Sequence, residues 1–160
     1  MLKHVLFALG LLAALALPGP VAVAAGDSSS SSVPVVSEDP DYAAGKRAVE
    51  AKNWQAALDA FNKVVAKDPG NAGAHNYLGY TYRKSGNLDL AFKEYEEALR
   101  INPKHRGAHE YLGEAYLMVD NLAKAEEHLK VLDKLCFFGC EEYDDLKKAV
   151  AEYKQKTANK

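Results

Sequence analysis

The chain has 160 residues, of which 48% are hydrophobic and 26% charged, and its formal net charge is −2. This length favours a single domain. Nucleic-acid-binding domains carry an excess of basic residues, so the charge balance argues against that class of partner.

The first 25 residues have the pattern of a signal peptide. Lys3 forms a short positive region, an apolar run covers residues 5–17, and small residues precede two adjacent cleavage sites, before Ala25 or before Gly26. A membrane anchor is the alternative, but this run is shorter than the roughly 20 apolar residues that span a bilayer. We therefore predict export, a periplasmic or secreted location, and no stable membrane insertion after cleavage.

Residues 26–37 follow as a linker. They contain an unbroken serine run at residues 28–32 and offer no apolar face for burial. Such a composition predicts a disordered, flexible segment.

Three copies of one pattern occupy residues 38–71, 72–105 and 106–139. Each copy predicts two amphipathic helices joined by a short turn, with apolar residues recurring at helical spacing. A period of 34 residues is typical of stacked helical arrays. The residues that recur at this period are Gly45, Gly79 and Gly113, Asn53, Asn87 and Asn121, and Ala57, Ala91 and Ala125.

The small residues explain how each pair of helices would pack. Gly79 and Gly113 have no Cβ, so we expect the partner helix to approach their backbone closely, with the recurring alanines doing the same from the second helix. Leu78 and Leu112 would fill the space around each close approach. One hairpin cannot bury such a face alone, and about three must stack to form a continuous core.

The end of the third copy departs from the pattern. The run Cys136-Phe137-Phe138-Gly139-Cys140 replaces the Asp-Pro or Asn-Pro turn that ends the first two copies. Residues 140–160 then predict an amphipathic capping helix that covers the apolar edge of the last copy. The apolar face of this helix consists of Tyr143, Leu146, Ala149, Val150 and Tyr153.

Residues 38–139 resemble the tetratricopeptide repeat. The second copy carries that family's pattern most completely, except that His75 replaces a large residue of the first helix. The matching residues are Leu78, Gly79, Tyr82, Ala91, Tyr95, Ala98 and Pro103. The resemblance implies an all-α fold, a right-handed superhelix of three helical hairpins (an alpha-alpha solenoid) plus the capping helix. The cysteine-containing turn with its terminal helix resembles short exported bacterial repeat proteins.

Enzyme motifs are lacking in the sequence. It has no glycine-rich phosphate loop, no G-x-S-x-G elbow and no His-Glu-x-x-His zinc motif, so we predict a non-enzymatic protein without cofactor or metal. His75 and His109 occupy the same packing position in successive repeats. His105 and His109 have the spacing of a helical metal pair, but a turn between repeats separates them.

The cysteines Cys136 and Cys140 form an even pair in a chain predicted to be exported. An oxidising compartment favours a disulfide, and Gly139 allows the chain to bend so that the sulfurs meet. Buried free thiols remain an alternative. A reactive or metal-binding pair, as in a thiol redox protein, is a further alternative, although the spacing is not the C-x-x-C of thiol oxidoreductases.

The first helices of the repeats should line a concave groove that binds a partner. We expect Tyr80 and Arg83 to be the main anchors and to be exposed in the free protein, whereas Tyr77 and Tyr111 either bind a partner or pack between repeats. The groove lacks the Lys/Asn/Arg arrangement of the chaperone-tail-binding members of the family. The predicted groove positions are Tyr42, Lys46, Val49, Asn76, Tyr77, Tyr80, Arg83, Lys84, Glu110, Tyr111, Glu114 and Leu117.

These features predict a periplasmic adaptor or scaffold that binds a protein or peptide. A self-assembling structural oligomer is the alternative, and the outer face of the capping helix discriminates between them: a polar face favours the adaptor. The identity of the partner and the oligomeric state stay open.

Overall fold

The computed structural model describes residues 39–159, which form seven helices and contain no strand. The predicted all-α class is therefore confirmed, while the predicted signal peptide and linker lie outside the described residues. None of the described helices is both long and apolar enough to span a membrane. The helices are α1 (Pro40–Glu50), α2 (Trp54–Lys67), α3 (Ala72–Lys84), α4 (Leu88–Ile101), α5 (Arg106–Met118), α6 (Leu122–Leu135) and α7 (Glu141–Ala158).

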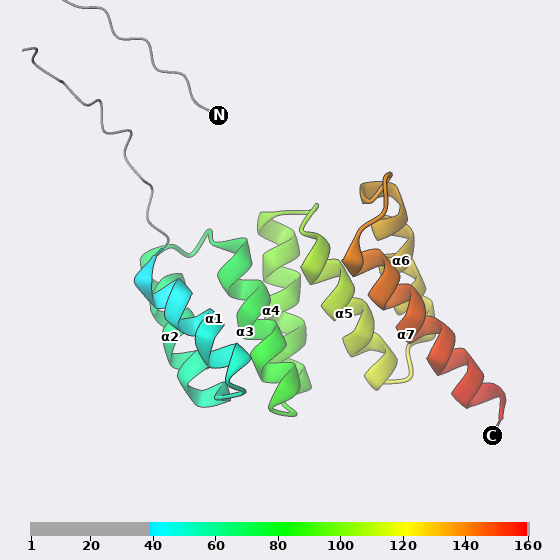
Figure 1. The fold of residues 1–160 in the computed structure, drawn as a ribbon, viewed down its shortest axis with the longest axis horizontal. Helices are drawn as coiled ribbons and strands as arrows, with labels where there is room; N and C mark the ends of the chain where they lie inside the picture. Colours follow the sequence, from blue (N-terminus) through cyan, green and yellow to red (C-terminus); the bar gives the residue numbers. More distant parts are fainter. Residues whose placement is uncertain (1–38, 160) are drawn as a thin grey trace, which may run out of the picture. The chain divides into compact units, whose positions relative to one another are not determined.

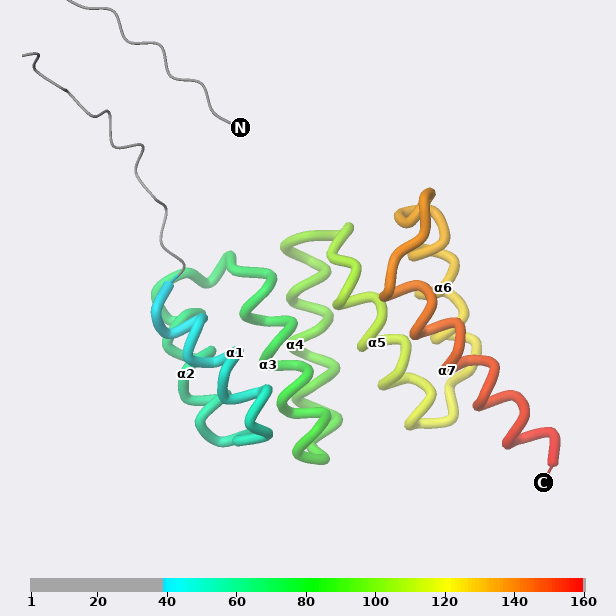
Figure 2. The backbone as a smooth tube through the Cα atoms, in the orientation of Figure 1, coloured from blue at the N-terminus to red at the C-terminus, as the bar shows by residue number. Residues whose placement is uncertain are grey.

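Consecutive helices pack in pairs, and the pairs stack side by side (Figures 1 and 2). The hairpins are α1–α2, α3–α4 and α5–α6, and α7 packs against both α5 and α6. Neighbouring odd-numbered helices approach one another, whereas α2 and α4 lie farther apart, as do α4 and α6. Because the odd-numbered helices are closer together, they form the inner, concave side of the stack.

The turn within each hairpin explains the recurring asparagine. Lys52, Gly86 and Asp120 take left-handed φ angles of 55°, 83° and 58° at equivalent positions and so reverse the chain direction. The asparagine that follows each of them caps the second helix, because its side-chain oxygen accepts a hydrogen bond from the backbone N–H three residues later.

The glycines of the first two hairpins lie against aromatic rings of the second helix. A Cβ on Gly45 would lie 2.6 Å from the ring of Phe61, and a Cβ on Gly79 would lie 2.6 Å from the ring of Tyr95. Both rings are fully buried. The predicted close approach is therefore confirmed in these hairpins, and the recurring alanines are likewise fully buried.

Gly113 differs from the other two glycines. The residue equivalent to Tyr95 in the third hairpin is Leu129, yet the atoms nearest to a Cβ on Gly113 belong to Leu146 of α7, at 2.6 Å. The prediction that Gly113 packs mainly against its own hairpin partner is thus wrong. With a leucine in place of the ring, the third hairpin accommodates a side chain from α7.

The apolar face predicted for α7 is confirmed. Leu146 is fully buried and Val150 is 4% exposed, and both join a core that includes Leu132 of α6. Tyr143, Ala149 and Tyr153 pack against the same core and are partly buried. Leu117, predicted as a groove residue, is 8% exposed and belongs to this core instead, because α7 and α6 close over it.

Replacing Gly79 by alanine should destabilise the protein. The new Cβ would overlap a ring that cannot move, so we expect a loss of about 1–3 kcal/mol in the free energy of unfolding, despite the better helix propensity of alanine. Gly107→Ala in α5 is the control, since its Cβ would meet nothing closer than 3.4 Å. Thermal melting followed by circular dichroism measures both. Equal melting temperatures for the two variants would contradict the packing described for Gly79.

Candidate partner-binding face

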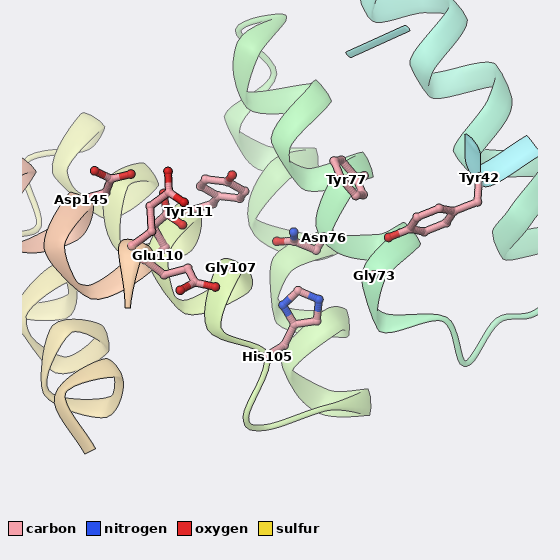
Figure 3. Close-up of a pocket in the computed structure, with 11 residues that line it drawn as sticks. Tyr42, Gly73, Asn76, Tyr77, His105, Gly107, Glu110, Tyr111 and Asp145 are labelled. Atoms are coloured by element: carbon pink, nitrogen blue, oxygen red, sulfur yellow. The ribbon is translucent and has the colours of Figure 1, made fainter. Parts of the chain in front are cut away.

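A cavity of about 380 Å³ opens on the inner side of the stack (Figure 3). All four odd-numbered helices contribute to its wall, with Tyr42 and Tyr77 on one side and Glu110 and Asp145 on the other. The lining residues are Tyr42, Gly73, Asn76, Tyr77, His105, Gly107, Glu110, Tyr111, Glu141, Glu142 and Asp145.

Asn76 is the most unusual polar residue of this wall. It lies in the second turn of α3 and is only 6% exposed. Its side-chain oxygen Oδ1 is buried and has no hydrogen-bond partner in the described part of the chain. Buried polar atoms are nearly always hydrogen-bonded in native proteins, so this oxygen marks a position where a donor is missing.

Glu110 lies one helix away on α5 and is 7% exposed. Burial, together with the nearby carboxylates of Glu114, Asp145 and Glu142, raises the pKa of Glu110 to about 8, although Arg83 acts in the opposite direction. Within residues 39–159 no side chain forms an ion pair with Glu110. The folded chain therefore holds a buried carboxyl group that stays mostly neutral at pH 7, because no cation within those residues pairs with its ionised form.

Aromatic side chains build the rest of the wall. Tyr77 stacks on Phe61 with ring centroids 4.8 Å apart, and Tyr42 meets both rings edge-on. Tyr111 packs against Tyr80 at 5.0 Å. Tyr77 and Tyr111 are half-buried and also line the cavity, so one part of each ring packs between helices while another remains accessible. The packing alternative for these tyrosines is thus confirmed, and their binding of a partner stays a prediction.

Two family models match the chain, and both describe the tetratricopeptide repeat. One matches residues 42–106 and the other residues 82–150, so together they cover the whole region from α1 into α7. The chain belongs to the tetratricopeptide-repeat family.

Solved structures of tetratricopeptide-repeat domains have the same fold. The TPR2B domain of yeast Sti1 in its pHsp70 complex is 16% identical, with a TM-score of 0.67, and the match covers 72% of this chain and 94% of that domain. The first repeat domain of Spaghetti (RPAP3), bound to the HSP90 peptide SRMEEVD, is 18% identical, with a TM-score of 0.62 and coverages of 70% and 89%.

A bacterial example is the type III secretion translocator chaperone SycD of Yersinia enterocolitica. It is 20% identical, with a TM-score of 0.65, and the match covers 74% of this chain and 83% of that one. At sequence identities of 16–20%, the structural similarity establishes the fold alone. The comparison with curated protein sequences finds no match.

Arg83 joins two tetratricopeptide repeats and is not an exposed anchor. Its side chain is 8% exposed, its Nη1 pairs with Glu114 of α5 at 2.6 Å, and its Nε donates a hydrogen bond to the Tyr95 hydroxyl oxygen at 3.3 Å. The guanidinium also lies 5.5 Å from the Tyr80 ring centroid and 5.4 Å from that of Tyr111. The expectation that Arg83 faces solvent is wrong because the neighbouring repeat covers it.

Several other predicted positions lie outside the cavity. Tyr80 is half-buried and faces a shallow hollow at the opposite end of α3, where its ring is 6.4 Å from that of Trp54; Val49 and Lys84 line the same hollow. Lys46 lies with its Nζ 5.6 Å from the Tyr42 ring centroid. The predicted groove residues thus separate into cavity residues (Tyr42, Asn76, Tyr77, Glu110 and Tyr111), peripheral residues (Lys46, Val49, Tyr80 and Lys84) and the internal pair Arg83 and Glu114.

The repeated histidines hold the turns between tetratricopeptide repeats. His75 Nε2 donates to the Pro69 carbonyl oxygen at 3.2 Å, and its Nδ1 lies 2.7 Å from the Glu94 carboxylate. His109 repeats this arrangement with Pro103 and with His128 Nδ1, at 3.1 and 2.9 Å. His105 instead caps α5 by accepting from the Ala108 N–H. His105 and His109 therefore direct their nitrogens to different partners.

The loop between α6 and α7 is closed at its base and apolar at its tip. The sulfur atoms of Cys136 and Cys140 lie within bonding distance, with the two Cα atoms 5.5 Å apart. Phe137 and Phe138 at the tip are 85% and 96% exposed. In the sequence these phenylalanines differ from the repeat pattern, and only the structure shows that they are exposed.

The contribution of α7 to the cavity was also missed. The sequence predicts a cap at residues 140–160, yet Glu141, Glu142 and Asp145 of this segment line the cavity beside Glu110. Their acidic run at the start of α7 was visible in the sequence. The sequence did not predict that α7 packs onto α5, and this packing brings the acidic run to the inner side.

Proposed function

We propose that the protein is a non-enzymatic adaptor that binds a protein or peptide partner on its inner face. The observation that carries this proposal is the single cavity to which α1, α3, α5 and α7 all contribute side chains. Two domains of the same fold were solved with a partner, one as a pHsp70 complex and the other bound to an HSP90 peptide. Recognition of an extended peptide by stacked helical pairs is consistent with this family.

Filling the cavity should abolish partner binding without unfolding the protein. Gly107 lies in the first turn of α5 on the cavity wall, and its Cβ position is free of overlap. The variant Gly107→Leu therefore places a side chain in the cavity and should lower partner affinity at least about tenfold. The experiment is affinity capture from periplasmic extract with the immobilised chain, followed by mass spectrometry and calorimetry with the partner obtained.

The matched control introduces the same residue on the outer side. Lys93 of α4 is exposed, so Lys93→Leu adds an equal apolar side chain away from the cavity. A protein that is captured by the parent and by Lys93→Leu, and lost with Gly107→Leu, supports the proposal. Retention with Gly107→Leu and loss with Lys93→Leu would assign binding to the outer side.

We further propose that the adaptor acts after export, with Cys136 and Cys140 joined in a disulfide. The proximity of the two sulfur atoms supports the bridge, and the predicted signal peptide supports an oxidising compartment. Thiol counting on protein purified from the periplasm without reductant should find no free cysteine. Two free, reactive thiols would instead favour the thiol redox alternative.

Self-assembly by end-to-end stacking has less support. Except for alanines, the exposed residues of α7 are polar, and they include Asp144, Lys147, Lys148 and Glu152. A stacking interface needs an apolar outer face, whereas a polar one terminates a repeat array. This face therefore favours a monomeric adaptor, which sedimentation of the exported protein tests.

A further inference from the structure

The cavity is acidic. Glu110, Glu141, Glu142 and Asp145 contribute carboxyl groups to its wall, and among residues 39–159 a basic ion-pair partner is seen only for Glu142, with Arg106 at 3.4 Å. Of the described lining residues only His105 is basic, and burial lowers the pKa of its imidazole. The wall therefore holds more carboxyl groups than basic groups, and a bound cation would also favour the ionised form of Glu110.

The spacing of these groups disfavours a bound metal ion. In the described chain, the only cluster of three potential ligands within 4.8 Å of one another is Cys136, Cys140 and Glu142, which does not include the carboxylates of α5 and Asp145. A calcium or magnesium ion needs oxygen ligands at about 2.0–2.6 Å from one centre, which brings them close together. Separated carboxylates suit a larger cation with several donors.

The remaining wall matches such a cation. The unpartnered Oδ1 of Asn76 lacks a donor, and lysine and arginine side chains have donors and no acceptor. Tyr77 and Tyr111 line the same cavity, and a tyrosine ring stabilises an ammonium or guanidinium group that lies against it. Arg83 already lies between the Tyr80 and Tyr111 rings in this manner inside the fold.

We infer that the cavity takes a lysine or arginine side chain from an extended, basic segment of the partner protein. Glu110 pairs with the cationic group, Asn76 Oδ1 accepts one of its hydrogen bonds, and the tyrosines flank its apolar stem. This inference rests on the proposed function and specifies the partner's chemistry.

The partner class therefore differs from that of a similar domain. The peptide SRMEEVD bound to the RPAP3 domain carries two glutamates and an aspartate. Such a sequence would place carboxylates against Glu110 and Asp145, where like charges repel. The cavity of this chain is complementary to a peptide of opposite charge.

Blocked nonapeptides of glycine and serine with three arginines serve as the probe. The matched peptides replace arginine by citrulline, which keeps the shape and removes the charge, or by glutamate. Titration into the 15N-labelled chain at low salt, followed by NMR, should shift the Asn76 side-chain amide and the backbone amides of Tyr77 and Tyr111. We expect the citrulline peptide to bind at least about tenfold more weakly than the arginine peptide, because it cannot form charge-assisted hydrogen bonds.

The variant Glu110→Gln should weaken arginine-peptide binding about tenfold, since glutamine cannot ionise to pair with the bound cation. It should not lower the melting temperature at pH 7.5. The pKa of Glu110 is about 8 in the folded chain, above its usual value, so folding favours the neutral carboxyl group. The folded state therefore loses stability as the pH rises from the usual pKa towards 8, and glutamine removes this loss. The control Glu96→Gln removes one exposed charge on α4 and should leave binding unchanged.

Equal binding of the arginine and citrulline peptides, or of Glu110→Gln and the parent, would overturn the inference. So would calcium, if it shifted the same resonances and displaced the peptide. Should Gly107→Leu abolish partner capture while Glu110→Gln binds normally, the adaptor proposal stands and only the cationic specificity falls. If instead Gly107→Leu still captures the partner, while Glu110→Gln weakens binding of the arginine peptide, the adaptor proposal fails.

Discussion

Ending the chain after Cys140, which removes α7, should lower the free energy of unfolding by roughly 3–6 kcal/mol. Leu146 and Val150 are buried in the core, and burial of such a side chain contributes about 1.5–3 kcal/mol each. The truncation also exposes Leu132 and the backbone beside Gly113. Because a typical domain is stable by only about 5–15 kcal/mol, we expect the third repeat to unfold and the protein to aggregate.

Ending the chain after Lys154 is the control for this truncation. Residues 155–159, the described residues that it removes, are all exposed, and it retains Leu146, Val150 and the hydrogen bond that the Tyr153 hydroxyl donates to Asp120. Circular dichroism and thermal melting compare both truncations with the parent. If the chain without α7 kept the helicity of its remaining residues and its melting temperature, α7 would be a tail and not a cap.

Replacing Arg83 by methionine should have the second largest effect, a loss of about 2–4 kcal/mol in the free energy of unfolding. Methionine keeps the apolar stem but leaves Tyr95 without its hydrogen-bond donor and Glu114 without its cation. Both partners lie between the second and third repeats, so the change weakens the interface that joins them. Thermal melting and urea denaturation measure the loss.

Arg100→Met provides the matched control. Arg100 pairs with Glu97 at 2.6 Å, as closely as Arg83 pairs with Glu114, but the Arg100 side chain is 70% exposed. An exposed ion pair contributes roughly 0–1 kcal/mol, so this variant should melt close to the parent. The double variant Arg83→Met/Glu114→Gln should recover part of the loss. Arg83→Met melting like Arg100→Met would show that burial of the pair does not stabilise the stack.

Helix packing within each repeat could be predicted from the sequence. The 34-residue period, the glycines and the alanines are local features, and they predicted the close approach of Gly79 to its partner helix. The apolar face of the cap was likewise predicted, because the periodicity of one helix shows which residues share a side. The same reasoning identified the inner-side positions that include Asn76, Tyr77 and Tyr111.

The sequence could not predict which of those positions are exposed to solvent. Periodicity assigns Arg83 to the inner side, but its burial depends on Glu114, which lies 31 positions later on α5 in the next repeat. Leu117 is misplaced for a similar reason, since α6 and α7 close over it. In both cases the deciding contact comes from another helix.

The sequence by itself determined the all-α repeat architecture, the helix hairpins and the residues that face inward. These depend on spacing along the chain, which a helix converts directly into a face. Only the tertiary structure decided which inward residues are buried, that Leu146 fills the space beside Gly113, and that carboxylates of α5 and α7 meet in one cavity. Those outcomes depend on the distances between helices of different repeats, which side-chain volumes set and which no pattern within one helix records.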